Sequence, residues 1–275
     1  MHALKKAKAD TSLGRIAYFD NGHAAETTLL FWPSLLMTAE LWQAQIDAFG
    51  DRYRVIAIDP PGHGDSDTLQ QRFSMEQCAD ALEQFMNTLS LERIVLVGNS
   101  WGAMLGAVFA ARYPQRIDAA VLINGTAAAA PLMQRLEFRL MVLLLKRMQR
   151  VPAWLSKKAV TAFAGETSER EQPQLIADID AAVRRCQPKS VAYAIDSVVI
   201  QRRDQHNVLG KIRCPTLIVA GEEDRTFPPA ETYGMAEAIA HAEWHQLPQV
   251  GHLAAREAPE QINQLIQAVL NDLQP

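Results

Sequence analysis

Cysteine is scarce in this sequence, and the few cysteines form no recognisable pattern. Three occur in 275 residues, at Cys78, Cys186 and Cys214. Their odd number and wide spacing exclude a disulfide framework and a Cys-x-x-Cys metal site. We interpret them as packed side chains of a protein from a reducing compartment.

Long apolar runs are also missing. The longest run in the middle of the chain, Leu140–Leu145, is far too short to cross a bilayer. The N-terminal segment MHALKKAKADTSLG has lysines but lacks the apolar stretch of a secretory signal. We therefore expect a soluble, cytoplasmic protein without stable membrane insertion.

A surplus of basic charge is absent as well. The chain has 27 Lys and Arg against 31 Asp and Glu, a net charge of −4, which argues against a nucleic-acid partner. The charge is unevenly distributed, because residues 126–210 carry 13 basic and 8 acidic side chains and the remainder has a net charge of −9. A basic middle segment thus lies between acidic flanking segments.

Short apolar runs are present, and they indicate strands buried on both faces of a parallel sheet. These runs are Tyr53–Ile58, Arg93–Val97, Ala119–Ile123 and Pro215–Ala220, with a shorter candidate at Glu243–Leu247. Helical spacing of apolar residues occurs in Ser74–Leu89, Ser100–Tyr113 and Gln261–Leu273. The alternation predicts a doubly wound, mostly parallel α/β sheet. Near the N-terminus, a hairpin is predicted from Leu13–Phe19 and Thr27–Trp32 across the Asp20-Asn21-Gly22 turn.

Residues 126–210 depart from this alternation. They contain no clear strand pattern, and helical spacing occurs at Leu132–Met148, Leu155–Phe163, Gln174–Arg185 and Ser190–Gln201. We predict a helical cap at 126–210, inserted between two sheet strands of a core domain that comprises residues 1–125 and 211–275.

The segment Gly98-Asn99-Ser100-Trp101-Gly102 is a G-x-S-x-G sequence between a predicted strand and a predicted helix. This context is typical of a nucleophile elbow, in which a tight turn presents the serine at the carboxyl edge of the sheet. Glycine flanks are needed because side chains there would clash. Ser100 is therefore the candidate nucleophile.

A serine hydroxyl is a weak nucleophile and needs a base that a third group holds in place. His252 follows the candidate strand Glu243–Leu247, and Asp224 follows the strand Pro215–Ala220. The order Ser100, Asp224, His252 is that of an α/β-hydrolase triad. Glu222 and Glu223 are rival acids that come earlier on the turn, and we expect them to face solvent.

The chain resembles an α/β-hydrolase-fold serine hydrolase over nearly its whole length. Five segments match in order, namely Ile16–Asp20, Asp59–Ser66, the elbow, Gly221–Asp224 and Gly251-His252. Ser34-Leu35 followed by Leu41-Trp42, and Ala111–Pro114 after the elbow, are similar to the 3-oxoadipate enol-lactonase and small carboxylesterase branch.

The resemblance implies that the backbone amides of Leu35 and Trp101 bind the oxyanion. The usual His-Gly pair after the third strand is replaced here by Pro33-Ser34. Because both donors are backbone groups, a change of side chain need not destroy the oxyanion site.

Candidate substrate-binding residues are Trp32, Ser34, Phe138 and Met141. Trp32 and Trp101 flank the expected site and form either an aromatic wall for the substrate or ordinary core. The segment Phe138–Arg150 interleaves apolar and basic residues. It either lies on a membrane surface or lines the inside of the cap with its basic face in solvent, and we favour the cap. A positive cap, with Arg139, Arg147 and Arg150, would attract an anionic ester or lactone.

These observations predict a serine hydrolase that cleaves a carboxylic ester or lactone without a metal or organic cofactor. His63 is interpreted as part of a structural turn, and His241 with His245 lacks the context of a metal site. The same triad would also serve C–C bond hydrolysis, perhydrolysis or acyl transfer, and a ligand receptor on this fold is the non-catalytic alternative. The sequence does not indicate the oligomeric state.

Overall fold

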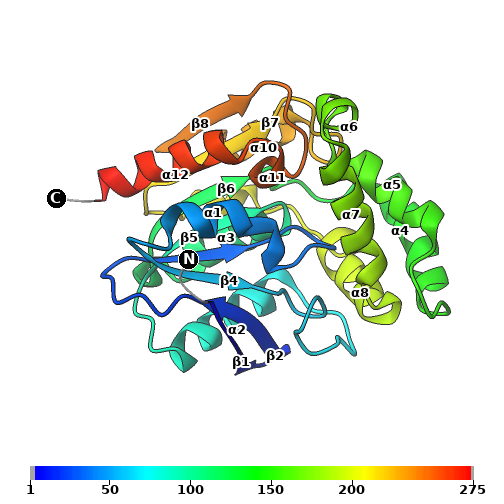
Figure 1. Cartoon of the computed structure of the whole chain (residues 1–275), viewed down its shortest axis with the longest axis horizontal. Coiled ribbons are helices and arrows are strands. Elements are labelled where there is room, and N and C mark those ends of the chain that lie inside the picture. Colours follow the sequence, from blue (N-terminus) through cyan, green and yellow to red (C-terminus); the bar gives the residue numbers. More distant parts are fainter. Residues whose placement is uncertain (1–3, 274–275) are drawn as a thin grey trace.

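A computed structural model describes residues 4–273. Met1–Ala3, the first residues of the N-terminal segment that lacks the apolar stretch of a secretory signal, lie outside the described residues. Eight strands form one sheet in the order β1-β2-β4-β3-β5-β6-β7-β8 (Figure 1). Neighbours from β4 to β8 are parallel, whereas β2 is antiparallel to both β1 and β4. The predicted doubly wound, mostly parallel sheet is confirmed. The strands are β1 Lys5–Thr11, β2 Gly14–Asp20, β3 Thr28–Trp32, β4 Arg54–Ile58, β5 Ile94–Asn99, β6 Ile117–Ile123, β7 Thr216–Gly221 and β8 Ala242–Leu247.

Helices cover both faces of the sheet (Figure 1). On one face, helix α1 contacts the C-terminal helix α12. On the other face, α2 and α3 pack together. The start of α2 is fixed by a capping box in which Ser74 and Gln77 bond to each other's backbone amides. The core helices are α1 Gln43–Phe49, α2 Met75–Thr88, α3 Trp101–Arg112, α10 Pro229–Glu237, α11 Ala254–Glu257 and α12 Pro259–Asp272, with 3-10 turns at Ala39–Trp42 and Pro114–Arg116.

The predicted N-terminal hairpin is wrong. Strand β2 pairs with β1 and β4, while β3 lies between β4 and β5 with every residue buried. The Asn21 side chain explains the difference, because its oxygen accepts from Val55 N at 3.0 Å and its amide donates to Gly50 O and Tyr53 O. The presumed hairpin turn is therefore attached to β4, and the true hairpin joins β1 to β2.

Helices alone connect β6 to β7, and residues 124–215 form no strand. The helices α4–α8 lie together at one end of the sheet (Figure 1). We refer to residues 126–210 as the cap. Its elements are α4 Leu132–Leu145, α5 Ala153–Phe163, α6 Glu166–Glu171, α7 Pro173–Arg185, α8 Pro188–Ile195, the π-helix Asp196–Ile200 and α9 His206–Leu209. Between residues 4 and 273, no helix has the length and apolar character that crossing a membrane requires.

Candidate active site

Ser100 stands in a sharp turn between β5 and α3. Its φ of 56° and ψ of −107° are unusual for a residue with a side chain, and such conformations cost about 1–3 kcal/mol. The turn is held by a hydrogen bond from Ser100 N to Ile123 O at 2.8 Å. The backbone is strained where the sequence predicted a nucleophile elbow.

The two flanking glycines are required by close backbone contacts. A Cβ atom on Gly98 would lie 2.2 Å from the carbonyl carbon and oxygen of Gly102, and one on Gly102 would lie 2.1 Å from Trp32 O. Neither backbone can move away without disturbing the sheet. The glycines thus allow α3 to start directly beside β3 and β5.

His252 and Asp224 are hydrogen-bonded to each other and fully buried. His252 Nδ1 lies 2.8 Å from Asp224 Oδ2. The other carboxylate oxygen of Asp224 accepts from the amides of Thr226 at 2.7 Å and Phe227 at 3.0 Å. The carboxylate is therefore fixed on both sides, and it can hold the imidazole with the proton on Nδ1 and the lone pair on Nε2.

The free nitrogen of this imidazole is buried without a partner. Within residues 4–273, nothing forms a hydrogen bond with His252 Nε2, Ser100 Oγ included. Hydrogen bonds between a nucleophile and its base are often loose before substrate binds. An unpaired buried nitrogen is costly, and a catalytic role is one reason for a folded protein to retain it. Here it belongs to the predicted general base.

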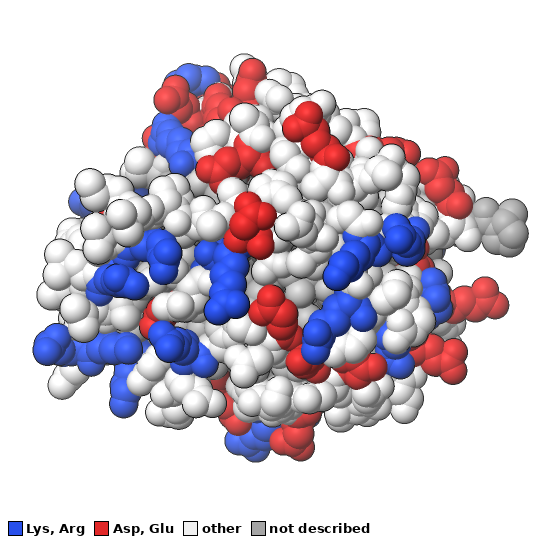
Figure 2. All heavy atoms as spheres, turned by 180° about the vertical axis from the view of Figure 1, so that it is seen from behind, with Lys and Arg blue, Asp and Glu red and all other residues white. Residues whose placement is uncertain are grey.

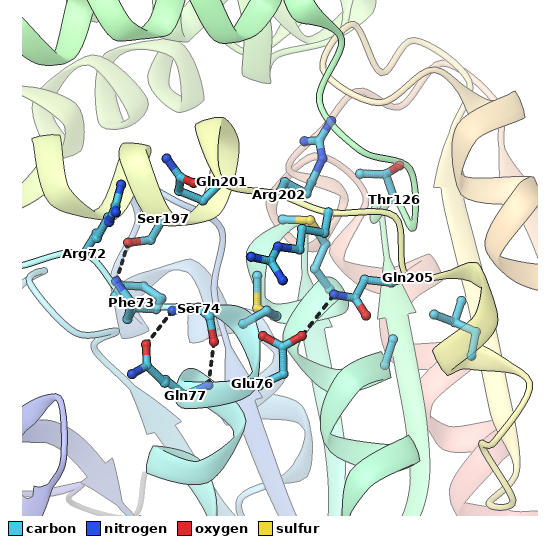
Figure 3. A pocket seen from close by; sticks show the side chains of 15 residues that line it. Arg72, Phe73, Ser74, Glu76, Gln77, Thr126, Ser197, Gln201, Arg202 and Gln205 are labelled. Carbon is cyan, nitrogen blue, oxygen red and sulfur yellow. Dashed lines mark hydrogen bonds between the residues drawn. The ribbon is translucent and has the colours of Figure 1, made fainter.

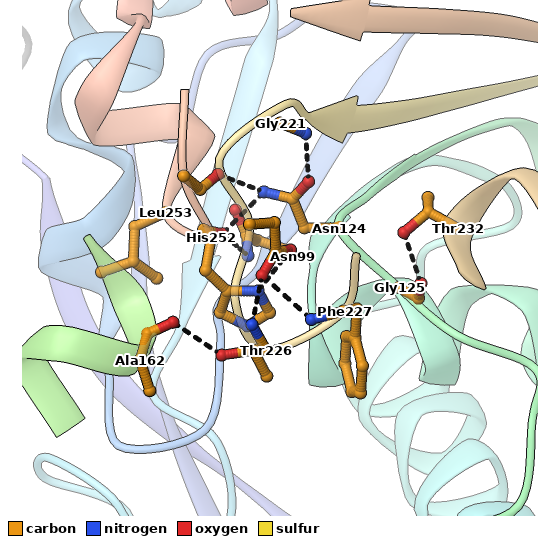
Figure 4. Close-up of polar contacts among 12 residues, drawn as sticks. Asn99, Asn124, Gly125, Ala162, Gly221, Thr226, Phe227, Thr232, His252 and Leu253 are labelled. Carbon is orange, nitrogen blue, oxygen red and sulfur yellow. Dashed lines mark hydrogen bonds and ion pairs between the residues drawn. The ribbon is translucent and has the colours of Figure 1, made fainter. Parts of the chain in front are cut away.

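Two buried asparagines, which the sequence analysis did not identify, hold the loop of His252 (Figure 4). Asn99 Nδ2 donates to His252 O at 2.9 Å, and Asn124 Nδ2 donates to His252 O at 2.8 Å. Asn124 Oδ1 also accepts from Gly221 N at 2.7 Å. Because Asn99 precedes Ser100, the elbow and the histidine loop are directly connected. The sequence did contain a signal for these two residues, because each asparagine stands at the carboxyl end of an apolar strand, where α/β folds place their functional groups.

The cap also contacts the histidine. Phe163 of α5 stacks on the His252 ring, with centroids 5.3 Å apart, and its carbonyl accepts from His252 N at 3.0 Å. Phe227 meets the ring edge-on at 5.6 Å. Buried Glu257 accepts from the amides of Gly165, Gly251 and Leu253 at 2.9–3.0 Å. No local sequence pattern indicated this role of Glu257. Its partners are backbone amides, which any residue type supplies, and one of them belongs to the distant Gly165.

The rival acids lie elsewhere. Glu222 is exposed, as expected, and accepts from Gln249 N at 3.0 Å. Glu223 is only half-exposed, and its two oxygens accept from the amide and the hydroxyl of Thr167 of α6, each at 2.8 Å. Its bonding capacity is used in attaching the cap to the core.

The two amides expected to bind the oxyanion are not engaged. Between residues 4 and 273, neither Leu35 N nor Trp101 N donates to a protein acceptor. Leu35 and Ser100 line the same cavity, and Trp101 follows Ser100 at the start of α3. Unsatisfied amides at a helix start favour an anion.

His63 fixes the loop that carries Leu35. Its Nε2 accepts from Leu36 N at 3.1 Å and its Nδ1 bonds to Pro61 O at 3.1 Å. Leu36 has a φ of 68°, so this hydrogen bond holds a strained residue next to the candidate oxyanion amide. Burial lowers the pKa of His63 to about 4, which keeps the ring neutral and able to accept. His63 has the structural role that its loop indicated.

His63 should make folding sensitive to mild acid. An unfolded histidine has a pKa of about 6.5, so between pH 6.5 and the folded pKa of about 4 only the unfolded chain binds this proton. The free energy of unfolding should therefore fall by about 3 kcal/mol as pH is lowered through this window. Urea denaturation of the wild type and His63→Gln at several pH values measures the difference. Equal pH slopes in the two proteins would contradict this role.

A small apolar cavity lies over Ser100, between the core and the cap. Its volume is about 140 Å³. Ser100, Leu35 and Leu36 form the core side, and most of the remaining wall comes from apolar side chains of the cap and from Phe227. The cap side chains include Phe138, Met141, Leu145, Leu155, Phe163, Val191, Ile195 and Val198.

The predicted substrate-binding residues divide into two groups. Phe138 and Met141 line the cavity over Ser100. Trp32 and Ser34 are fully buried and do not line it, and Trp32 packs against Trp101 with centroids 5.8 Å apart. Both tryptophans therefore lie in the core and not in a substrate wall. The cap residues Arg139, Arg147 and Arg150 are exposed and lie outside the cavity as well.

A larger and more polar cavity of about 540 Å³ adjoins this one (Figure 3). It lies between the start of α2 and the segment that follows the π-helix, and it contains Arg72, Arg203 and Glu76. Met104 and Arg202 line both cavities. Among the described residues, no group of three or more His, Cys, Asp or Glu side chains is arranged to hold a metal ion.

The chain is similar to known proteins over most of its length. Residues 27–259 match the sequence pattern of the α/β-hydrolase fold family. The chain is 29% identical over 263 residues to a 2-hydroxy-6-oxononadienedioate/2-hydroxy-6-oxononatrienedioate hydrolase from Paraburkholderia phymatum, covering 92% of this chain and 89% of the relative. It is 24% identical over 253 residues to 3-oxoadipate enol-lactonase 2 from Acinetobacter baylyi, covering 92% of each.

A solved structure is similar throughout. A thermophilic esterase from Thermogutta terrifontis superposes with a TM-score of 0.89 at 26% identity, covering 98% of this chain and 100% of that chain. The family match includes Ser100, Asp224 and His252. The resemblance inferred from the motifs is thereby confirmed, and the chain belongs to the α/β-hydrolase-fold family of enzymes.

Proposed function

We propose that this enzyme is a serine hydrolase that cleaves a carboxylic ester or a lactone. One observation carries the proposal: Asp224 holds His252 through Nδ1, the opposite nitrogen is buried and unpaired, and Asn99, which precedes Ser100, bonds to the His252 carbonyl. This is the arrangement that a general base for a serine nucleophile requires. The strained backbone of Ser100 adds support, because such strain is concentrated at functional sites.

In the proposed reaction, Ser100 Oγ attacks the carbonyl carbon of the ester while His252 Nε2 takes the hydroxyl proton. The amides of Leu35 and Trp101 donate to the oxyanion of the tetrahedral intermediate. When the intermediate collapses, His252 returns the proton to the leaving alcohol. Water then attacks the acyl carbon while giving a proton to His252 Nε2. When this second tetrahedral intermediate collapses, the bond to Ser100 Oγ breaks, His252 returns the proton to Ser100 Oγ, and the acid is released.

The cavity supports a short apolar acyl group. Its volume of about 140 Å³ is similar to that of an apolar cavity of about 150 Å³ that binds one benzene molecule. The apolar side chains of the cap would exclude water from the oxyanion and so strengthen the hydrogen bonds that stabilise it. We infer that the cap selects substrates by shape.

A second candidate, an anionic ester or lactone, is favoured by Arg202. This arginine borders the cavity of Ser100, and among the described residues no carboxylate lies within 4.0 Å of it. Its Nε donates to Ala128 O at 2.8 Å and its guanidinium lies 5.0 Å from the Phe227 ring centroid. Desolvation lowers its pKa more than the charge of Glu231 raises it, so a substrate carboxylate would compensate a poorly solvated cation.

If Arg202 binds a carboxylate, Arg202→Gln should reduce kcat/KM for a hemisuccinate ester by about 10- to 100-fold, because a hydrogen bond to a charged group contributes about 1.5–3 kcal/mol. Hydrolysis of the matching neutral butyrate ester should change by less than about threefold. Arg203→Gln is the matched control, since Arg203 lines only the larger cavity. Equal losses on both esters in Arg202→Gln would reject the anionic substrate.

The proposed function is tested by trapping the acyl-enzyme. Mixing enzyme with p-nitrophenyl butyrate should release one p-nitrophenol per active site before steady turnover, and a fluorophosphonate should label Ser100, identified by peptide mass spectrometry. Failure to label Ser100 would overturn the proposal and favour a receptor. A panel with product analysis separates ester hydrolysis from C–C hydrolysis, perhydrolysis and acyl transfer, which use the same residues.

A further inference from the structure

The outer side of the cap helix α4 exposes large apolar side chains. Leu132 is 70% exposed, Met133 77% and Leu140 61%, and Trp154 at the start of α5 is 54% exposed. Among the described residues, the other exposed large apolar side chains are Leu136, Leu143 and Leu144 of the same helix, and Tyr233 elsewhere. We define the α4 outer face by the exposed residues Leu132, Met133, Leu136, Leu140, Leu143, Leu144 and Trp154.

The opposite side of α4 is already occupied. Phe138, Met141 and Leu145 line the cavity over Ser100, and Val142 is buried beneath the helix. The outer leucines do not line this cavity, and much of their apolar surface is exposed. An apolar surface of this kind on a folded protein marks a site of interaction.

The same part of the cap is strongly basic. Residues 132–158 contain seven Lys or Arg and one acidic residue, a net charge of +6 in a chain whose total is −4. The single acid, Glu137, pairs with Lys158. Arg139, Arg147 and Arg150 are exposed, and within residues 4–273 none of them has a carboxylate partner. Basic and uncharged side chains alternate over this end of the molecule in Figure 2, with little acidic surface between them.

We propose that the α4 outer face attaches the enzyme to the surface of a bilayer containing anionic phospholipids. Leucines and a tryptophan would enter the interface, while the surrounding cations contact lipid phosphates. A helix of 14 residues would lie in the plane of the surface and not across it. Phe138–Arg150 has two interpretations, either as a membrane-surface segment or as the inner lining of the cap. Both interpretations can hold, because one side of α4 lines the cavity and the other side is exposed.

A second copy of the chain fits this face less well. In a two-fold contact the same patch meets itself, so the cations of one copy would face those of the other. Such like-charge contacts oppose association. An anionic lipid surface instead supplies the opposite charge over a wide area. The charge of the patch therefore favours a bilayer over a homodimer.

Vesicle flotation tests the proposal. The full-length protein should bind vesicles of equal parts dioleoylphosphatidylglycerol and dioleoylphosphatidylcholine at least about tenfold better than pure dioleoylphosphatidylcholine, at about 0.15 M salt. Leu136→Ser/Leu140→Ser and Arg139→Glu/Arg147→Glu should each weaken binding at least about tenfold. Lys211→Glu/Arg213→Glu, a charge reversal on the exposed core surface, is the matched control and should bind like the wild type. Brominated lipids should quench Trp154, and the quenching should be lost in Trp154→Phe.

Other outcomes overturn the proposal. Equal binding to both kinds of vesicle would exclude recognition by anionic lipid. A dimer in light scattering that Leu136→Ser/Leu140→Ser converts to monomer, without vesicle binding by the wild type, would assign the face to a second copy. Circular dichroism and hydrolysis of a soluble short ester should be unchanged in these variants, because the outer residues do not line the cavity. Ser100→Ala should bind vesicles normally, which separates docking from the reaction.

Discussion

Ser100→Ala is expected to lower kcat for p-nitrophenyl butyrate by about 10⁴- to 10⁶-fold, because the covalent route is lost and only binding and oxyanion stabilisation remain. The fold should be unaffected. Among residues 4–273, Ser100 Oγ has no hydrogen-bond partner, and the turn is held by the backbone bond from Ser100 N to Ile123 O. Steady-state kinetics and thermal unfolding of the same preparation measure both effects.

Ser90→Ala is a matched control for this substitution. Ser90 has a φ of 54°, close to the 56° of Ser100, but it is exposed after the end of α2 and does not line the cavity. The same chemical change in a similar backbone conformation should leave kcat unchanged. More than about 1% of wild-type activity in a Ser100→Ala preparation free of wild-type enzyme would mean that another group is the nucleophile.

Asp224→Asn is expected to reduce kcat by about 10⁴-fold with little change in structure. The amides of Thr226 and Phe227 donate to Oδ1, so the oxygen of the new amide would remain on their side. Its NH₂ group would then face His252 Nδ1, where the carboxylate oxygen lies at 2.8 Å. The imidazole would have to accept there and carry its proton on Nε2. In that tautomer it cannot take the proton of Ser100.

Two companion variants make this result specific. Glu223→Gln changes the neighbouring acid, which bonds to Thr167 and not to His252, so kcat should remain within a few-fold of wild type. Ser100→Ala/Asp224→Asn should be no slower than Ser100→Ala alone, because residues of one catalytic unit are not additive. An activity of Asp224→Asn within tenfold of wild type would exclude Asp224 as the partner of the base.

The catalytic candidates were predictable because their signals are local. Gly98 and Gly102 are required because a Cβ atom added to either would lie within 2.2 Å of a neighbouring backbone atom. This requirement appears in the sequence as a short motif between an apolar strand and a helix. Asp224 and His252 each follow a strand at the edge where all parallel strands end. Strand β5 was recognisable because all six of its residues are buried and the first four, residues 94–97, form a continuous apolar run.

Other features depend on contacts that sequence spacing does not encode. Strand β1 was missed because KKAKADT is an edge strand with mostly exposed side chains. The hairpin was misplaced because the partners of β2 are decided by Asn21 and β4 and not by the turn. In α4, leucines lie both on the cavity side and on the solvent side, so composition alone does not reveal which residues are exposed.

The attachment of His252 to Phe163 has a consequence for exchanging caps between relatives. Phe163 accepts the His252 amide and stacks on its ring, and Gly165 shares the carboxylate of Glu257 with Gly251. A chimera that replaces residues 126–210 as one block would bring a new wall to the cavity over Ser100. It would also lose the contacts of Phe163 and Gly165 that orient the His252 imidazole. We expect transplants that keep Phe163–Gly165 to change selectivity without changing turnover, and whole-block exchanges to change both.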